Sequence, residues 1–194
     1  MASMLEIERR FLVDGRREKP WRNASEHFEI RQLYLDSTLI IPTDCSTGLS
    51  YAGIEIITNL GNGIYNDIHQ NKDWVSRIRK KGDLFFFTLK GKTEGIATQE
   101  HEFEVTSNVF SKILEGKDYP EVVKTRYNWL SKDGMIWEVD EFEGNLAGLI
   151  IAEVELPNEN HVIELPSWLG MEITYAKGWS NADLAKLVMT AQNN

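Results

Sequence analysis

Pairs of like-charged residues, separated by a single position, recur along this chain. In a β-strand, residues i and i+2 point to the same face and lie roughly 7 Å apart. Each pair therefore places two like charges side by side on one face of a strand. Because like charges repel, a repeated pattern of both signs favours a shared polar interior that holds a polyanion together with metal cations. The acidic pairs are Glu6/Glu8, Glu102/Glu104, Glu138/Asp140 and Glu153/Glu155, and the basic pairs are Arg77/Arg79 and Lys124/Arg126.

The acidic pairs have the chemistry of a site for Mg²⁺ or Mn²⁺. Carboxylate oxygens suit these hard cations, which retain water ligands and bridge substrate phosphates. An apolar residue lies between the two acids of each pair, as Ile7, Val139 and Val154 do. If the apolar side faces a conventional core, the acids face solvent; in a closed barrel they equally well face the lumen. The alternation fits both orientations.

The basic pairs have the chemistry of a phosphate site. Arginine binds phosphate oxygens with two parallel hydrogen bonds, whereas lysine acts more as a point charge. Lys90 follows the Arg77/Arg79 pair on the next expected strand. A triphosphate carries roughly four negative charges at neutral pH, so several cations are needed to hold it. Basic residues are outnumbered, because the chain has 30 acidic and 21 basic residues and a net charge of −9. Their pairing on expected strands is therefore a specific feature of the sequence. That balance argues against general nucleic-acid binding.

Other metal chemistry is disfavoured by the composition. The four His residues do not repeat at ligand spacing, and the single Cys45 excludes an internal disulfide and a cysteine-based zinc site. No apolar run approaches the roughly 20 residues that span a bilayer. The first residues lack the basic and apolar regions of a signal peptide, so a cytoplasmic protein is expected.

Most of the chain is predicted to form strands, because apolar and polar residues alternate along it. Lys81-Gly82-Asp83 and Ser131-Lys132-Asp133-Gly134 have the composition of tight turns. Successive strands joined by such turns indicate an antiparallel sheet or barrel. The expected strands cover residues 5–13, 28–41, 74–80, 84–90, 98–106, 121–130, 135–142 and 150–156.

Two helices are expected to interrupt the strands. The first covers residues 107–115, with Ser107 as N-cap and Gly116 as its stop. The second begins at Ser180-Asn181 and has an apolar stripe formed by Leu184, Leu187, Val188 and Ala191. A short helical turn is expected within residues 158–168. The glycine-rich segment 42–72 reads as an insertion or an extra hairpin, with a lid over the site as one possible role.

The ordered set of charged pairs resembles the CYTH family, also called triphosphate tunnel metalloenzymes. Glu6-Ile7-Glu8-Arg9-Arg10 resembles the E-x-E-x-K signature of this family, with Arg10 in place of the lysine. The resemblance runs through the pairs above and ends in residues 168–174 and 179–185, so it omits little besides 42–72. It implies a mainly β, α+β fold, in which an eight-stranded antiparallel barrel forms a charged tunnel with flanking helices. The 194 residues would form one CYTH-like domain with an insertion at 42–72.

The resemblance also implies a role for each charged residue, although no residue is assigned as general base. Because Arg10 replaces a compact ammonium with a planar fork, its effect on turnover is an open question. The expected cofactor is Mg²⁺ or Mn²⁺. The implied metal side comprises Glu6, Glu8, Asp140, Glu153 and Glu155. The implied phosphate ligands are Arg10, Arg77, Arg79, Lys90, Lys124, Arg126 and Lys177, and further tunnel acids are Glu102, Glu104 and Glu138.

The opening and closing segments look most like the small bacterial tripolyphosphatases of this family. The leading hypothesis is therefore metal-dependent hydrolysis of inorganic tripolyphosphate. Hydrolysis of thiamine or nucleoside triphosphates, cyclisation of ATP as in class IV adenylyl cyclases, and noncatalytic polyphosphate binding are the alternatives. The expected partner is a small-molecule triphosphate, with no nucleic acid and no membrane, and a homodimer is left open.

Overall fold

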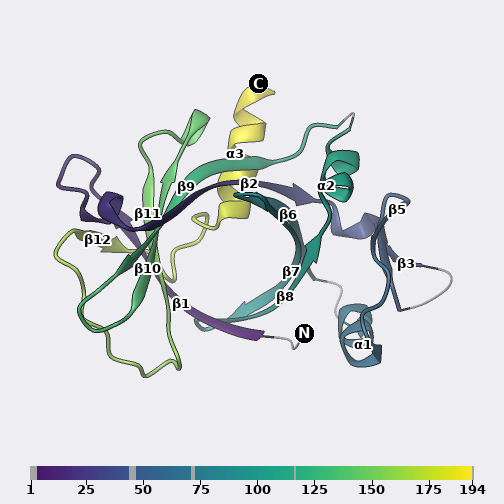
Figure 1. Cartoon of the computed structure of the whole chain (residues 1–194), viewed down its shortest axis with the longest axis horizontal. Helices are drawn as coiled ribbons and strands as arrows, with labels where there is room; N and C mark the ends of the chain where they lie inside the picture. The colour runs from purple at the N-terminus through teal and green to yellow at the C-terminus, as the bar shows by residue number, and fades with distance from the viewer. Residues whose placement is uncertain (1–3, 44–46, 71–72, 116, 194) are drawn as a thin grey trace.

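Eight antiparallel strands form a closed barrel in the computed structural model, which describes residues 4–43, 47–70, 73–115 and 117–193 (Figure 1). The order around the barrel is β11-β10-β9-β2-β6-β7-β8-β1, and β1 closes the ring by pairing with β11. This confirms the predicted eight-stranded antiparallel barrel. The strands are β1 (Met4–Val13), β2 (Glu26–Leu35), β6 (Val75–Lys81), β7 (Leu84–Glu94), β8 (Ala97–Val105), β9 (Glu121–Leu130), β10 (Ile136–Phe142) and β11 (Ile150–Glu155).

One set of apolar residues of β1, β10 and β11 lies on the outer face of the barrel. Phe11, Val139 and Val154 are buried there in a cluster with Trp137 and Trp168. Because neighbouring residues on a strand point to opposite faces, the acids on either side of these positions face the lumen. The packing therefore settles the orientation that alternation alone left open.

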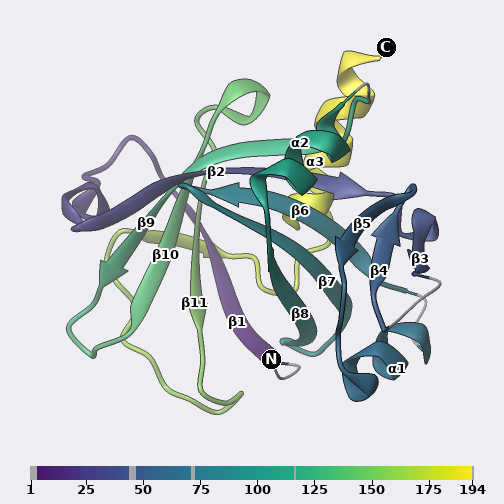
Figure 2. The same cartoon turned by 45° about the vertical axis from the view of Figure 1, so that its right-hand side comes forward.

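The segment around residues 42–72 covers the outer wall of the barrel on the other side (Figures 1 and 2). It contains a small sheet of β3 (Ile40–Pro42), β4 (Leu49–Tyr51) and β5 (Ile54–Ile57), followed by α1 (Asn62–Gln70). Together with α2 (Ser107–Leu114) it buries apolar side chains against Ile78, Phe87 and Leu89. Asp67 of α1 also meets His101 of β8, with Nε2 and Oδ2 2.7 Å apart. The segment is thus seated on the wall rather than in the position of a lid.

The C-terminal helix α3 (Asn181–Gln192) packs at one end of the barrel interior. The helix begins where the sequence predicted, and Ser180 caps it by accepting a hydrogen bond from the Asp183 amide. Leu184 and Ala185 are buried against the apolar residues that end the lumen face of the strands, among them Tyr34, Val122, Phe142 and Ile151. The predicted apolar stripe is wrong at Leu187, which is 63% exposed.

Several other element boundaries differ from the predictions. The predicted strand 28–41 ends at Leu35, because the Asp36 carboxylate accepts the Thr38 amide and starts a 3₁₀ turn, η2 (Ser37–Leu39). Thr106 rather than Ser107 caps α2, and the predicted stop at Gly116 lies outside the described residues. No helix forms in residues 158–168, all of which are described.

Short elements complete the fold. The remaining 3₁₀ turns are η1 (Pro20–Asn23) and η3 (Gly144–Leu146). A ninth strand, β12 (Leu169–Glu172), extends the sheet beside β1 and was not predicted. Among the helices of the described residues, none has both the length and the apolar character that a bilayer crossing requires.

Candidate active site

The lumen is divided into an acidic wall and a basic wall by the order of the strands. The neighbours β1, β11 and β10 carry most of the acids, whereas β9 and β6 carry paired cations on either side of β2. The register brings Arg10 opposite Glu153, Glu8 opposite Glu155 and Asp140 opposite Arg126. The barrel therefore gathers residues that are up to about 150 positions apart into one interior.

The densest contacts join β9 to β10 and β11. Arg126 donates from Nε and Nη2 to the two carboxylate oxygens of Asp140, each at 2.6 Å, and from Nη2 to Glu153 Oε2 at 3.0 Å. Its Nη1 also donates to Glu138. Lys124 is 1% exposed and donates to the same Asp140. Two buried cations thus share one buried carboxylate, an arrangement that holds all three side chains in place.

A second group surrounds Lys90. Its ammonium donates to Glu6 Oε2 at 2.7 Å and lies 3.5 Å from Glu100 Oε2. Burial acts to lower the pKa of Lys90, but the nearby Glu8 and Glu6 outweigh it, so the pKa of Lys90 is raised and the ammonium stays charged. Glu100 was not predicted as a site residue, although it stands two positions before Glu102 on the same face of β8.

The arginine pair of β6 faces β7 and β8. Arg79 Nη2 donates to Glu102 Oε2 at 2.7 Å, and Thr88 donates to the same oxygen at 3.0 Å. Arg77 Nη2 lies 3.4 Å from Glu100 Oε1. The Nε atoms of both arginines are buried without a hydrogen-bond partner among the described residues. Burial and the neighbouring Arg77 lower the pKa of Arg79. These guanidinium groups therefore have unused donors inside the lumen.

Arg10, in the signature lysine position, bridges two parts of the structure. Its Nε donates to Glu153 Oε1 at 2.9 Å, and its Nη2 donates to the carbonyl oxygen of Trp179 at 3.0 Å. Burial acts to raise the pKa of Glu153, but Arg10 and Arg126 outweigh it and hold that pKa well below its ordinary value. Glu153 is thus a fixed negative charge between two arginines.

Glu8 has the opposite environment. Burial, followed by the repulsion of Glu153, raises the pKa of Glu8 to about 7. No ion pair or hydrogen bond among the described side chains uses its carboxyl group. The pKa of Glu155 is also raised, first by burial and then by Glu138 and Glu6. For both groups, burial and the neighbouring acids outweigh the nearby cations, Lys90 among them.

These unpaired carboxylates fit a divalent metal ion, which the family implies. Their oxygens are the ligand type that Mg²⁺ and Mn²⁺ accept, and a cation would relieve the repulsion that raises the pKa of Glu8 and Glu155. Across the described residues, no three His, Cys, Asp or Glu side chains are yet gathered at metal-binding distance. The carboxylates are therefore the right ligand type for a divalent metal ion. In this structure, however, they pair with cations or lie too far from one another to share a metal ion.

Two of the sequence-predicted residues lie outside this interior network. Glu104 is exposed at the end of β8 and borders a pocket of about 800 Å³ between β5 and α2. Lys177 is exposed in the turn between β12 and α3 and joins none of the ion pairs found among the described residues. The other predicted residues lie on the lumen face of the barrel strands.

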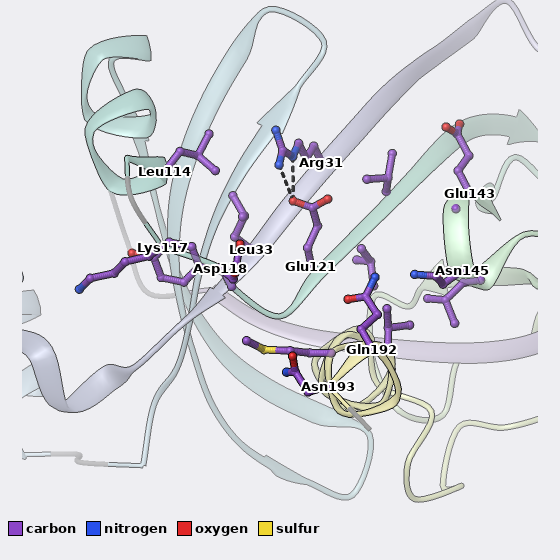
Figure 3. Close-up of a pocket in the computed structure, with 17 residues that line it drawn as sticks. Arg31, Leu33, Leu114, Lys117, Asp118, Glu121, Glu143, Asn145, Gln192 and Asn193 are labelled. Atoms are coloured by element: carbon purple, nitrogen blue, oxygen red, sulfur yellow. Dashed lines mark hydrogen bonds and ion pairs between the residues drawn. The ribbon is translucent and has the colours of Figure 1, made fainter.

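A further pocket of about 410 Å³ lies outside the barrel (Figure 3). It is bordered by β2, β9 and the C-terminal part of α3, and it contains an ion pair of 2.6 Å between Arg31 and Glu121. None of the sequence-predicted site residues lines it. The chemistry expected from the sequence is therefore located in the lumen and not in this outer hollow.

The fold and the lumen together define a class of protein, a closed antiparallel barrel with opposed acidic and basic walls inside it. The chain belongs to the CYTH domain family, whose model matches residues 4–185.

Named relatives agree with this assignment. An inorganic triphosphatase of Acetivibrio thermocellus is 40% identical over 117 residues, which cover 60% of this chain and 74% of that protein. An inorganic triphosphatase of Nitrosomonas europaea is 34% identical over 111 residues, which cover 56% and 73%. The crystal structure of the inorganic triphosphatase NE1496 superposes with a TM-score of 0.56 at 28% identity, covering 93% of each chain. The chain is thus similar to inorganic triphosphatases in both sequence and fold.

Proposed function

We propose that this protein hydrolyses inorganic tripolyphosphate with the help of Mg²⁺ or Mn²⁺ in the barrel lumen. The observation that carries the proposal is the group of lumen cations, buried at Lys124 and Arg126 and half-buried at Arg77 and Lys90, with carboxylates as their partners. Buried charge is costly unless it is paired or serves a ligand. The named relatives support the choice of triphosphate as that ligand. We also propose that residues 1–194 form one domain, with 42–72 as an insertion.

Binding would exchange the partners inside the lumen. Lys90, Lys124 and Arg126 would turn from carboxylates to phosphate oxygens, which offer them stronger negative charge. The carboxylates so released, with Glu8 and Glu155, would be the ligands for the metal ion. A bound divalent metal would polarise a phosphoryl oxygen and help to activate a water molecule. The cations would thus bind phosphate while the carboxylates bind the metal ion, and the lumen would keep its charge balance.

The chain's own residues would orient the substrate and balance its charge. Arg126 presents a fork that matches two oxygens of one phosphate, and Arg79 presents a second fork from the other side of β2. Glu153, held ionised between Arg10 and Arg126, would keep these guanidinium groups in place. The negative charge that develops on the leaving phosphate would then be stabilised by preorganised cationic side chains.

An inorganic substrate agrees with the surfaces that the lumen offers. The rings of Phe28 and Phe86 each already have a cation over one face, since Lys81 lies 4.5 Å from the Phe28 ring centroid and Arg79 lies 5.6 Å from that of Phe86. At the other end, Tyr34 and Phe142 pack against α3. A nucleobase or thiamine ring would have to displace one of these contacts to stack.

Phosphate release from tripolyphosphate, ATP and thiamine triphosphate, each with Mg²⁺ or Mn²⁺, tests the proposal. We expect tripolyphosphate to have the highest kcat/KM and chelation of the metal to stop turnover. A preference for ATP with formation of cyclic AMP would assign the cyclase activity instead. Tight binding of tripolyphosphate without release of phosphate would sink the hydrolase proposal and leave a binding module.

A further inference from the structure

The strand between the two basic strands carries no charge where it faces the middle of the lumen. β2 pairs with β9 on one side and with β6 on the other. Its inward positions from residue 28 to residue 34 are Phe28, Ile30, Gln32 and Tyr34. Gln32 is therefore an uncharged polar group placed between the cations of β9 and those of β6.

Gln32 is buried with half of its amide group unused. The residue is 1% exposed, and its Nε2 donates to the hydroxyl oxygen of Tyr34 at 2.7 Å. Its Oε1 is buried and finds no hydrogen-bond partner among the described residues. An unpaired buried acceptor costs about 1–3 kcal/mol, so such a group calls for a functional explanation.

Unused donors lie on the strand opposite. Gln32 stands across from Arg79 in the β2–β6 register, and Tyr34 stands across from Arg77. The Nε atoms of both arginines are buried without partners in the described part of the chain. Three unsatisfied polar atoms therefore belong to facing residues of one strand pair, in the part of the lumen that would hold phosphate.

We propose that Gln32 is a substrate-binding residue that donates a hydrogen bond from its amide nitrogen to a phosphate oxygen of the triphosphate. The inference rests on the proposed function and extends it to a neutral ligand of the substrate. The amide group would turn over on binding, which places Nε2 in the lumen and Oε1 on the Tyr34 hydroxyl. Burial raises the pKa of Tyr34 to about 12, so that hydroxyl keeps its proton and can donate a hydrogen bond to Oε1.

A neutral donor suits this position better than a charged one. Arg79 already experiences the repulsion of Arg77 and Arg126 in addition to its burial. A further cation on β2 would add to this repulsion, and an acid would compete with phosphate for the arginines. An amide offers a hydrogen bond without either effect, and either of its two ends satisfies Tyr34. Gln32 would thus keep its hydrogen bond with Tyr34 both with and without bound substrate.

Substitution by methionine tests the contact, because Gln32→Met keeps the length of the side chain and removes both polar atoms. The probe is imidotriphosphate, which has nitrogen bridges that resist hydrolysis, titrated calorimetrically in the presence of Mg²⁺. A hydrogen bond to a charged group contributes about 1.5–3 kcal/mol, so we expect affinity to fall about 10- to 100-fold. The matched control is Gln192→Met, on the exposed end of α3, which should bind as the wild type does. Equal affinity of Gln32→Met and the wild type would overturn the proposal.

The wild-type side-chain amide gives an independent readout. In ¹⁵N-labelled protein, the Gln32 NH₂ resonances should shift downfield when imidotriphosphate is added, which a residue that only supports Tyr34 would not show. Unmoved resonances at saturation would refute the contact even if Gln32→Met fails to fold. Failure of the proposed function is recognised separately, because the wild type would then release no phosphate from tripolyphosphate, whether or not it binds imidotriphosphate.

Discussion

The guanidinium of Arg10 connects the lumen to the backbone just before the C-terminal helix, with Nη2 3.0 Å from the carbonyl oxygen of Trp179. Trp179 directly precedes Ser180, the N-cap of α3. The other end of the same fork is held by Glu153. A planar fork can reach two partners in different directions, whereas a lysine has a single ammonium group. The arginine that replaces the signature lysine therefore makes an additional contact, the one with Trp179.

Arg10→Lys should keep the ion pair with Glu153 and lose the contact with Trp179. We expect the free energy of unfolding in urea to fall by about 1–2 kcal/mol, the contribution of one charged hydrogen bond. Amide hydrogen exchange in residues 181–192 should become faster. The control is Arg9→Lys, whose partner Glu172 is on the surface, with an expected loss below about 1 kcal/mol. Equal losses for the two variants would contradict the tether.

Glu8→Gln should separate metal binding from stability. Loss of a proposed metal ligand should raise the Mg²⁺ concentration needed for half-maximal phosphate release by at least about tenfold. Without metal, the same change removes a buried carboxyl group that Glu153 repels, so the melting temperature should rise. Glu104→Gln, at the exposed end of β8, should change neither quantity. A wild-type Mg²⁺ dependence for Glu8→Gln would remove Glu8 from the site.

Glu141 should contribute stability that depends on pH. Its carboxylate accepts hydrogen bonds from Trp21 Nε1 and Arg22 Nε, both at 2.8 Å, and the Arg22 contact in particular lowers the pKa of Glu141 below its ordinary 4.5. A lowered folded pKa means that the contribution is complete above pH 4.5 and is lost as the pH falls through the folded value.

Glu141→Gln should accordingly be less stable than the wild type by about 1–2 kcal/mol at neutral pH. The difference should narrow as the pH falls below 4.5 and vanish once the folded carboxyl is protonated. Urea unfolding of both proteins between pH 3 and pH 8 measures it. A difference that does not vary with pH would show that packing, and not charge, is lost in the variant.

Gly170 should be required for the pairing of β12 with β1. A Cβ atom there would lie 2.6 Å from the carbonyl oxygen of Leu12, so the two backbones would have to separate. We expect Gly170→Ala to lower the free energy of unfolding by about 1–3 kcal/mol. Gly63, in α1, has nothing within 4 Å of the added atom, and Gly63→Ala should be neutral or slightly stabilising. Equal effects of both variants would count against the close approach.

The sequence predicted the strands well because alternation is a local property. It could not show which face was the inner one, since Ile7 and Val154 look the same beside a core and beside an outer cluster. That orientation depends on Trp137 and Trp168, which pack outside the barrel and leave the acids inside. Closure of the ring by β1 and β11 is equally non-local, and the family resemblance rather than the alternation indicated it.

The residues that the sequence missed are those whose role depends on a partner strand. Gln32 is a neutral residue on the uncharged inner face of β2, and the role proposed for it comes from facing Arg79 across the register. Glu100 could have been found, because it continues the alternation of Glu102 toward the start of β8. Asp36 ended β2 earlier than expected because its side chain bonds to the Thr38 amide, a competition that hydrophobic periodicity does not report.

The packing of Leu184 and Ala185 against Tyr34 and Phe142 gives one end of the lumen face an apolar lining. This lining offers no charge to an anion, so a phosphate chain bound as proposed would lie along the charged positions and stop short of α3. The length of the charged stretch, and not the length of the barrel, would then limit how many phosphate groups are held at once.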